Sequence, residues 1–122
     1  MNPTASKQKP GEQKPWPLDL TFDRQQSLLM VAYEDATVLE IPFELLRVES
    51  PSAEVQGHGG QKIIVKDKAS VGVTDAVPVG RYAVRIVFDD GHSTGIYSWE
   101  YLHHLGQHKD ALLAKYRASL AG

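Results

Sequence analysis

The chain has 122 residues, which is enough for one domain of ordinary size with a genuine hydrophobic core. With 42% hydrophobic and 23% charged residues its composition is that of a globular protein, and 13 basic against 15 acidic residues do not supply the clustered positive charge of a nucleic-acid-binding protein. The absence of cysteine excludes disulfides, thiolate zinc sites and cysteine-ligated iron–sulfur clusters within the chain.

Residues 1–17 differ in composition from the rest and are rich in proline, lysine and glutamine. Such a segment buries too little apolar surface to offset the entropy cost of ordering it. We therefore expect a disordered tail over 1–17 and one folded domain over 18–122. The tail has no apolar stretch typical of a signal peptide, and no run approaches the ~20 apolar residues that cross a bilayer. We expect a cytoplasmic protein that binds neither a membrane nor nucleic acid.

The folded domain begins with alternating apolar and polar residues over 18–23, the pattern of a half-buried strand. The same pattern predicts strands over 29–33 and 37–41, joined by a turn over 34–36. Ala36 stands where a glycine would be more favourable, so we do not expect a tight primed turn there.

A short helix is predicted after the third strand, with Pro42 at its first position and Pro51 ending it. The polar, glycine-rich segment 52–61 indicates a surface loop. Further strands are predicted over Ile63–Val65 and Val71–Val79.

The segment Tyr82–Trp99 is typical of a β-hairpin that leads directly into a helix. One face of its first strand is formed by alternate residues, namely Tyr82, Val84, Ile86 and Phe88. Asp90 and Gly91 provide the positive φ angles that a tight primed turn needs. His92 follows at once and lies at this turn.

Two helices are predicted at the C-terminal end. Ser98 can cap the first, which stops at Gly106, and the second covers Lys109–Leu120. We interpret the nearby aromatic residues Tyr97, Trp99 and Tyr101 as core packing. Strands first and helices last predict an α+β fold, a small antiparallel β-rich domain with the C-terminal helices packed on one face or end.

Three stretches resemble one known family, the gamma-butyrobetaine hydroxylase-like N-terminal domain. They are FDDGHSTGIYSWEYL (Phe88 to Leu102), IPFELLRVESPSAEVQGHG (Ile41–Gly59) and VPVGRYAVRIVF (Val77–Phe88). With the opening hairpin, the resemblance covers about 18–110. It implies a small β-rich α+β domain that occurs alone in bacteria, ahead of the oxygenase domain in carnitine-synthesis hydroxylases, or attached to P-loop ATPases that carry iron–sulfur clusters.

The chain differs from the hydroxylase branch of this family at the positions that the resemblance matches to zinc ligands. The hydroxylase branch holds zinc through a Leu-Arg-Asp-Asn-Cys-x-Cys-x-x-Cys stretch and a later histidine. Leu46, Arg47 and the histidine, His92, are present here, whereas the three cysteine positions are Ser50, Ser52 and Val55. Serine hydroxyls bind zinc weakly and valine has no donor. We therefore expect no cofactor and a chain that folds without metal.

Two interpretations of His92 are open. As a remnant ligand for iron or zinc, it would join His58 or the carboxylates of Asp89 and Asp90. As a structural residue, which we favour, it would cap the hairpin by hydrogen-bonding to a turn carbonyl or to a carboxylate.

Other histidines suggest chemistry less strongly. His103 and His104 point about 100° apart on a helix and are interpreted as helix surface. The spacing of His108 and Asp110 matches the His-x-Asp of iron oxygenases, but only twelve residues follow. We regard this match as coincidental and expect Asp110 to cap or begin the last helix.

The sequence contains no recognisable catalytic set, so we expect a non-catalytic binding or adaptor module rather than an enzyme. The resemblance suggests a protein partner, an iron–sulfur carrier ATPase. The predicted contact surface is the hairpin turn with its neighbours, namely Asp89, Asp90, Gly91, His92, Arg47 and His58. The alternative is a labile metal-binding protein that uses His92 and the nearby acids.

Overall fold

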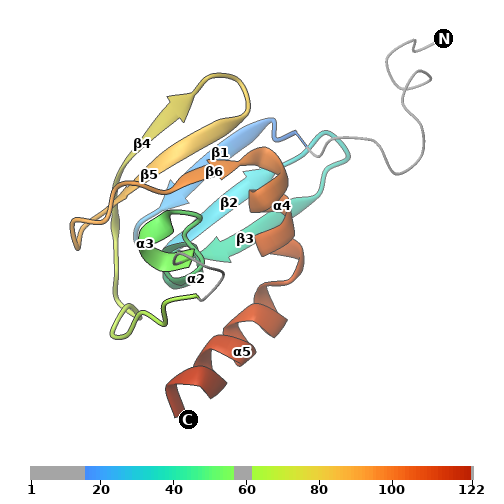
Figure 1. Cartoon of the computed structure of the whole chain (residues 1–122). Coiled ribbons are helices and arrows are strands. Elements are labelled where there is room, and N and C mark those ends of the chain that lie inside the picture. The colour runs from blue at the N-terminus through green and yellow to red at the C-terminus, as the bar shows by residue number, and fades with distance from the viewer. Residues whose placement is uncertain (1–15, 57–61, 122) are drawn as a thin grey trace, which may run out of the picture.

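The computed structural model describes residues 16–56 and 62–121 and shows two three-stranded antiparallel sheets with helices (Figure 1). The elements in chain order are β1 (Asp19–Asp23), β2 (Leu28–Ala32), β3 (Val38–Pro42), α2 (Phe43–Val48), α3 (Ala53–Gln56), β4 (Val73–Val79), β5 (Ala83–Phe88), β6 (Ile96–Ser98), α4 (Trp99–Gln107) and α5 (Lys109–Ala121). Each sheet follows the chain, β1-β2-β3 and β4-β5-β6, so neighbouring strands are joined directly. The predicted α+β class is confirmed.

The core lies between the two sheets and under the helices. The fully buried side chains come from both sheets and from α2 and α4, and the largest are Tyr97, Phe43, Phe88, Leu29, Ile41, Leu45, Leu46, Ile86, Leu102 and Leu105. Figure 1 shows α4 beside β3 and β6, at one end of the sheets, and α5 leading away from them. The predicted position of the C-terminal helices is therefore confirmed.

The first sheet follows the predicted alternation. Leu29 and Val31 of β2 and Ile41 of β3 are fully buried. The β2–β3 turn is closed by the Tyr33 amide, which donates to the Thr37 carbonyl at 2.9 Å. Ala36 has φ 70°, so three residues with a left-handed alanine form this turn rather than a two-residue primed turn, as predicted.

In the second sheet the hairpin is confirmed, with two corrections. Tyr82 is 66% exposed and precedes β5, so the predicted inward alternation holds only for Val84, Ile86 and Phe88. The β5–β6 turn covers 89–95 instead of two residues, and only Gly91 within it has a positive φ, 93°. The turn is longer because pairing with β6 begins only at Ile96.

The middle of the chain departs most from expectation. Pro42 is the N-cap of α2 and not its first residue. Part of the predicted loop is the helix α3, and Val55 within it is buried. The segment 63–65 is not a strand, because the Ile63 amide donates to the Val55 carbonyl instead of pairing with a sheet. The strand predicted from Val71 begins at Val73.

The C-terminal helices form largely as predicted. The Ser98 hydroxyl accepts from the Tyr101 amide at 3.1 Å and caps α4. The predicted stop at Gly106 is wrong, since α4 continues to Gln107. A Cβ on Gly106 would lie 2.8 Å from Leu39, so this glycine allows helix and sheet to approach closely. Asp110 lies in the first turn of α5, as predicted.

The three aromatic residues at this junction pack inward, as predicted. Tyr97 is fully buried and donates to the Leu46 carbonyl at 2.5 Å, while Tyr101 donates to the Glu49 carbonyl at 2.5 Å. Burial raises the pKa of Tyr97 and raises that of Tyr101 to about 12, so both hydroxyls remain donors at neutral pH. Trp99 is half-buried.

Candidate functional site

The β5–β6 turn (residues 89–95) is the loop at the left of Figure 1, and it contains most of the predicted site residues. It folds back on β5, because the Phe88 amide donates to the His92 carbonyl at 2.9 Å and the Gly91 amide donates to the Phe88 carbonyl at 3.2 Å. Gly91 has open space around it, so only its φ of 93° requires glycine there.

Asp90 fixes the turn to two other parts of the chain. Its Oδ2 lies 2.8 Å from Nε of Arg47, on α2, and 2.7 Å from Nζ of Lys68. Its Oδ1 accepts from the amide of His92 at 3.0 Å. The carboxylate is 18% exposed and the Arg47 side chain 10%, so this ion pair is shielded from solvent.

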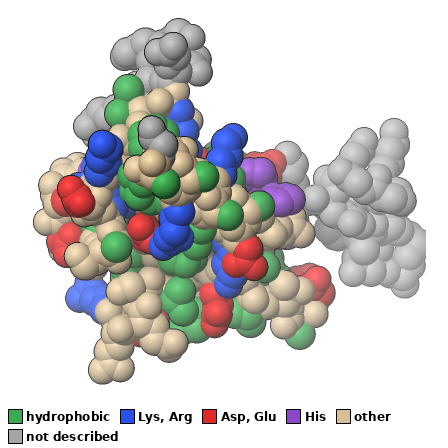
Figure 2. Space-filling model, turned by 90° about the horizontal axis from the view of Figure 1, so that it is seen from below, with side chains coloured by type: hydrophobic (Ala, Val, Ile, Leu, Met, Phe, Trp, Pro, Cys, Tyr) green, Lys and Arg blue, Asp and Glu red, His purple; other side chains and the backbone are tan. Residues whose placement is uncertain are grey.

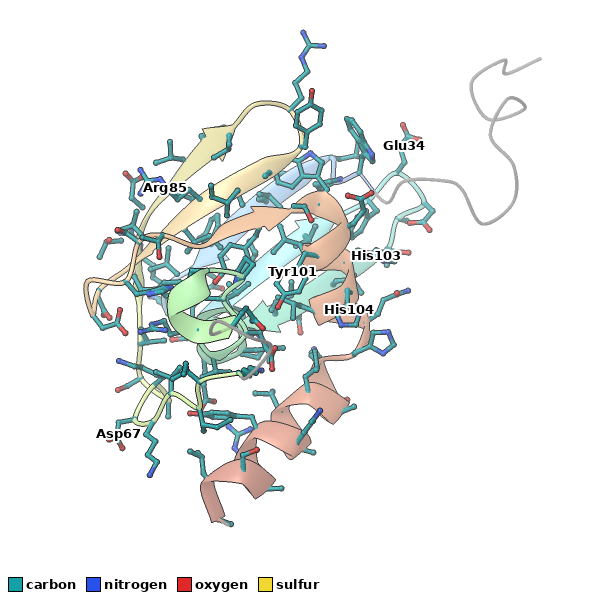
Figure 3. The ribbon with its side chains drawn as sticks, in the orientation of Figure 1. Glu34, Asp67, Arg85, Tyr101, His103 and His104 are labelled. Carbon is teal, nitrogen blue, oxygen red and sulfur yellow. The ribbon has the colours of Figure 1, made fainter. Side chains whose placement is uncertain are left out.

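Burial alone would raise the pKa of this carboxyl. The hydrogen bonds from Lys68, from the amide of His92 and from Arg47 outweigh burial, and the pKa lies well below its usual range. Asp90 is therefore ionised at neutral pH and acts as the acceptor that joins three segments. Arg85, labelled in Figure 3, adds a further contact, because its Nη1 donates to the Ser93 carbonyl at 3.1 Å.

His92 is buried, with 7% of its surface exposed, and its ring faces the segment that follows α2. Its Nε2 lies 2.9 Å from Oγ of Ser50 and 3.3 Å from Oγ of Ser52, and the two hydroxyls are themselves 3.3 Å apart. Ser50 is held at the end of α2, where the side chain of Gln56 donates to its carbonyl at 2.8 Å. The three side chains form a compact hydrogen-bonded cluster below the turn.

This cluster occupies the positions that the resemblance matched to a zinc site. Two of the three positions corresponding to cysteine, Ser50 and Ser52, do meet His92, and the third, Val55, is buried. The donor set is one imidazole, two hydroxyls and a side chain with no donor atom, which does not fit a tetrahedral zinc ion. Among residues 16–56 and 62–121, no group of three or more His, Asp and Glu side chains could hold a metal ion.

The structure brings together five of the six predicted contact residues: Arg47, Asp89, Asp90, Gly91 and His92. The sixth, His58, lies outside the described residues. Sequence reasoning missed Lys68, which no motif connects to the turn. It also missed Gly95, where a Cβ would lie 2.4 Å from Oγ of Ser50. A pair of glycines flanking a histidine is a weak signal that the backbone there approaches another segment closely.

The remaining predicted histidines lie on and just after α4. Figure 3 shows His103 and His104 on this helix, away from the β5–β6 turn. His103 is half-buried with its ring edge-on to Tyr33, at a centroid distance of 5.4 Å. His104 and His108 are exposed. None of them joins His92 in a single site.

The model of the family described as "Gamma-butyrobetaine hydroxylase-like, N-terminal" matches residues 20–103. The chain belongs to this family. The match includes both sheets, α2, α3 and the start of α4, and therefore all the residues around the β5–β6 turn. A search of curated proteins gives no match.

Solved structures support the membership. A structure determined by NMR in solution is 39% identical with a TM-score of 0.78, and the match covers 90% of this chain and 87% of that one. A second NMR structure is 39% identical with a TM-score of 0.72 and coverages of 93% and 89%. A crystal structure from Acidithiobacillus ferrooxidans, a protein of unknown function in the DUF971 family, is 40% identical with a TM-score of 0.63 and coverages of 74% and 91%.

The family is thus a domain of unknown function and not a known class of enzyme. In the described part of the chain, no helix combines the length and the apolar character needed to cross a bilayer.

Proposed function

We propose that this family member is a non-catalytic binding module that presents its β5–β6 turn to a protein partner. The observation that supports the proposal is the way the turn is held. Asp90 contacts both α2 and Lys68, and His92 contacts the serines after α2. Asp90 and His92, the side chains of the turn that could act in acid–base catalysis, are therefore both engaged in fixing the loop.

A loop fixed in this way loses little conformational entropy when it binds, which favours recognition. Exposed loops on rigid scaffolds are also the usual carriers of binding function. The exposed residues of the turn include Asp89 and Thr94, with Gly91 between them. Among the described residues, the ion pairs of the turn are made by Asp90, which leaves the Asp89 carboxylate as an exposed negative charge.

For the partner, we infer an iron–sulfur carrier ATPase. The support for this is the family resemblance, since related domains occur attached to such ATPases. A basic or mixed-charge surface on the ATPase would complement Asp89, because opposite charges across an interface guide association and orientation.

The test is direct binding between the purified full chain and a purified carrier ATPase, measured by calorimetry. The variant Asp89→Lys reverses an exposed charge on the turn and should weaken binding at least tenfold. The matched control is Glu34→Lys, which makes the same reversal on the exposed β2–β3 turn, at the opposite side of the molecule in Figure 3, and should bind like the wild type. Equal weakening by both variants would show a non-specific charge effect, and no binding by the wild type would exclude this partner.

The alternative function, labile metal binding at His92 with Asp89 or Asp90, makes different demands on the site. The ring of His92 would have to leave two serine hydroxyls, and Asp90 would have to leave two cations. Iron(II) titration followed by amide chemical shifts distinguishes the two functions. Our proposal expects no saturable shifts at 89–92 and an unchanged melting temperature after dialysis against a chelator, whereas saturable shifts there would favour the metal function.

A further inference from the structure

A pair of histidines on the opposite side of the molecule has no part in the proposed binding surface. His104 lies in the last turn of α4, and His108 is the C-cap of that helix. The backbone between them is helical, since the His108 amide donates to the His104 carbonyl at 3.0 Å. Their ring centroids are 4.8 Å apart with an interplanar angle of 48°.

Both side chains are accessible. Each is exposed, and among the described residues neither ring is tied down by a hydrogen bond or an ion pair. Figure 2 shows histidine side chains gathered at the molecular surface. On one side His104 stacks on Tyr101, with a centroid distance of 6.2 Å and an interplanar angle of 21°, which limits the orientations of the ring.

The spacing of the pair suits a shared ion. Residues four apart on a helix face the same side, so both rings can turn a nitrogen toward one point. Two imidazole nitrogens bound to one zinc ion, each at about 2.0–2.1 Å, lie about 3 Å apart. The ring centroids are 4.8 Å apart and both side chains are exposed, so rotation about χ1 and χ2 can turn one nitrogen of each ring toward a shared ion.

The two helix ends near the pair act on a cation in opposite directions. The C-terminal end of α4 carries the negative end of its helix dipole, whereas α5 begins at Lys109 and its positive end lies beside His108. Two other side chains lie nearby: Lys109 follows the pair, and its Nζ is 4.0 Å from Oε1 of Glu40. The Glu40 carboxylate partly offsets the charge of Lys109.

We propose that His104 and His108 form a two-ligand site for a late first-row divalent cation such as Zn²⁺, Cu²⁺ or Ni²⁺. Neutral imidazole is a preferred ligand of these ions, whereas Mg²⁺ and Ca²⁺ prefer oxygen. With two protein ligands, a tetrahedral zinc ion keeps two positions for water or for a side chain from another molecule. The site is labile, because only two ligands come from the protein, and each ring binds the ion through a neutral imidazole nitrogen.

The experiment is a zinc titration of the full chain, purified without a histidine tag, followed by amide chemical shifts and by calorimetry. We expect one saturable zinc ion with shifts concentrated over 100–110. His104→Ala and His108→Ala should each weaken the affinity at least tenfold.

Three controls complete the test. His103→Ala changes a histidine on the same helix whose ring packs on Tyr33, and it should alter the affinity less than twofold. His92→Ala and His58→Ala should likewise leave the shifts over 100–110 unchanged. Both ligand positions are exposed, so melting temperatures near that of the wild type will show that the fold is intact. Zinc shifts that persist in His104→Ala, or that map to another part of the chain, would overturn the proposal.

Discussion

The β2–β3 turn and the β5–β6 turn both reverse a strand with the help of one left-handed residue, but they are stabilised differently. In the β2–β3 turn, Ala36 has φ 70°, and the hydrogen bonds stay between Tyr33 and Thr37. In the β5–β6 turn, Gly91 has φ 93°, and the decisive contacts come from Arg47 and Ser50, 43 and 42 residues earlier than their partners.

The difference separates a local turn from a tertiary one. The hydrogen bonds of the β2–β3 turn lie within residues 33–37, so this turn can form as soon as the strands pair. The β5–β6 turn has its shape only when α2 and Lys68 are already in place. Its conformation is therefore coupled to the global stability of the domain, and a change beneath it should cost more than a similar change at the other turn.

The largest effect is expected from Phe88→Ala, which removes a buried ring next to that of His92, at a centroid distance of 6.1 Å. We expect a loss of about 3–5 kcal/mol in the free energy of unfolding, because a cavity is left in the core. Tyr82→Ala removes an aromatic ring from the exposed side of the same hairpin and should change stability by less than about 0.5 kcal/mol. Denaturant unfolding checks both, and similar losses would show that the core does not extend under the turn.

This pair of residues also shows how far the sequence alone could predict the fold. Alternation predicted the buried face of β5 at Val84, Ile86 and Phe88, because period-two patterning reports directly on which side of a sheet is buried. It failed at Tyr82, where the chain has not yet entered the sheet. The alternation of apolar residues predicts which face of a strand is buried, but it does not predict the residue at which the strand begins to pair with its neighbour.

The candidate site was predictable only in part, for a related reason. Asp90, Gly91 and His92 are adjacent and carry a recognisable turn signal, and Arg47 came from the family resemblance. The contact with Lys68 has no local signature, because it depends on how the irregular segment before β4 passes the turn. Val55 was misplaced in a surface loop, since one buried valine among polar residues gives no periodic pattern.

Asp90→Asn sharpens the comparison by removing the charge that joins the β5–β6 turn to two cations. We expect a loss of about 1.5–3 kcal/mol at neutral pH, typical of hydrogen bonds to charged groups that are shielded from solvent. Asp35→Asn changes the acid of the β2–β3 turn, which is exposed and accepts from the Thr37 amide at 3.0 Å, and should cost less.

The stability difference between the wild type and Asp90→Asn should depend on pH in a definite direction. Because the folded-state pKa of Asp90 lies below its usual value, ionised Asp90 stabilises the fold above the unfolded pKa of about 3.9, and this contribution is lost as the pH falls toward the folded pKa. The gap between wild type and Asp90→Asn should therefore be largest near pH 7 and shrink below about pH 4. A gap that stays constant down to pH 3 would contradict the ion pair as its source.

His92→Ala tests whether the histidine is structural. Its removal leaves the hydroxyls of Ser50 and Ser52 without their shared partner in a buried place, and we expect a loss of about 1–3 kcal/mol. His104→Ala is the exposed counterpart and should change stability by less than about 0.5 kcal/mol. Thermal unfolding in the presence of a chelator separates this effect from any contribution of bound metal, and a loss that disappears with the chelator would identify His92 as a ligand instead.

The smallest effects come from exchanging alanine and glycine at the two left-handed positions. A side chain at positive φ costs about 1–2 kcal/mol, while glycine adds about 0.5–1 kcal/mol of entropy to the unfolded chain, so the net change is about 0.5–1 kcal/mol. Gly91→Ala should destabilise the domain by this amount, and Ala36→Gly should stabilise it by no more than this amount. A Cβ on Gly91 meets no atom within 4 Å, so the expected loss at this position comes from the positive φ of the backbone and not from a steric clash.

The two substitutions also report on how rigid each turn is. The β5–β6 turn cannot relax its φ without disturbing Asp90 or His92, so Gly91→Ala should show the full penalty. The hydrogen bonds of the β2–β3 turn are local and Ala36 is exposed, so this turn can adjust and Ala36→Gly should gain less than Gly91→Ala loses. Because the positions lie in different sheets and share no partner, the double variant should melt slightly below the wild type. A double variant that melts above it would mean that the local turn is the more strained of the two.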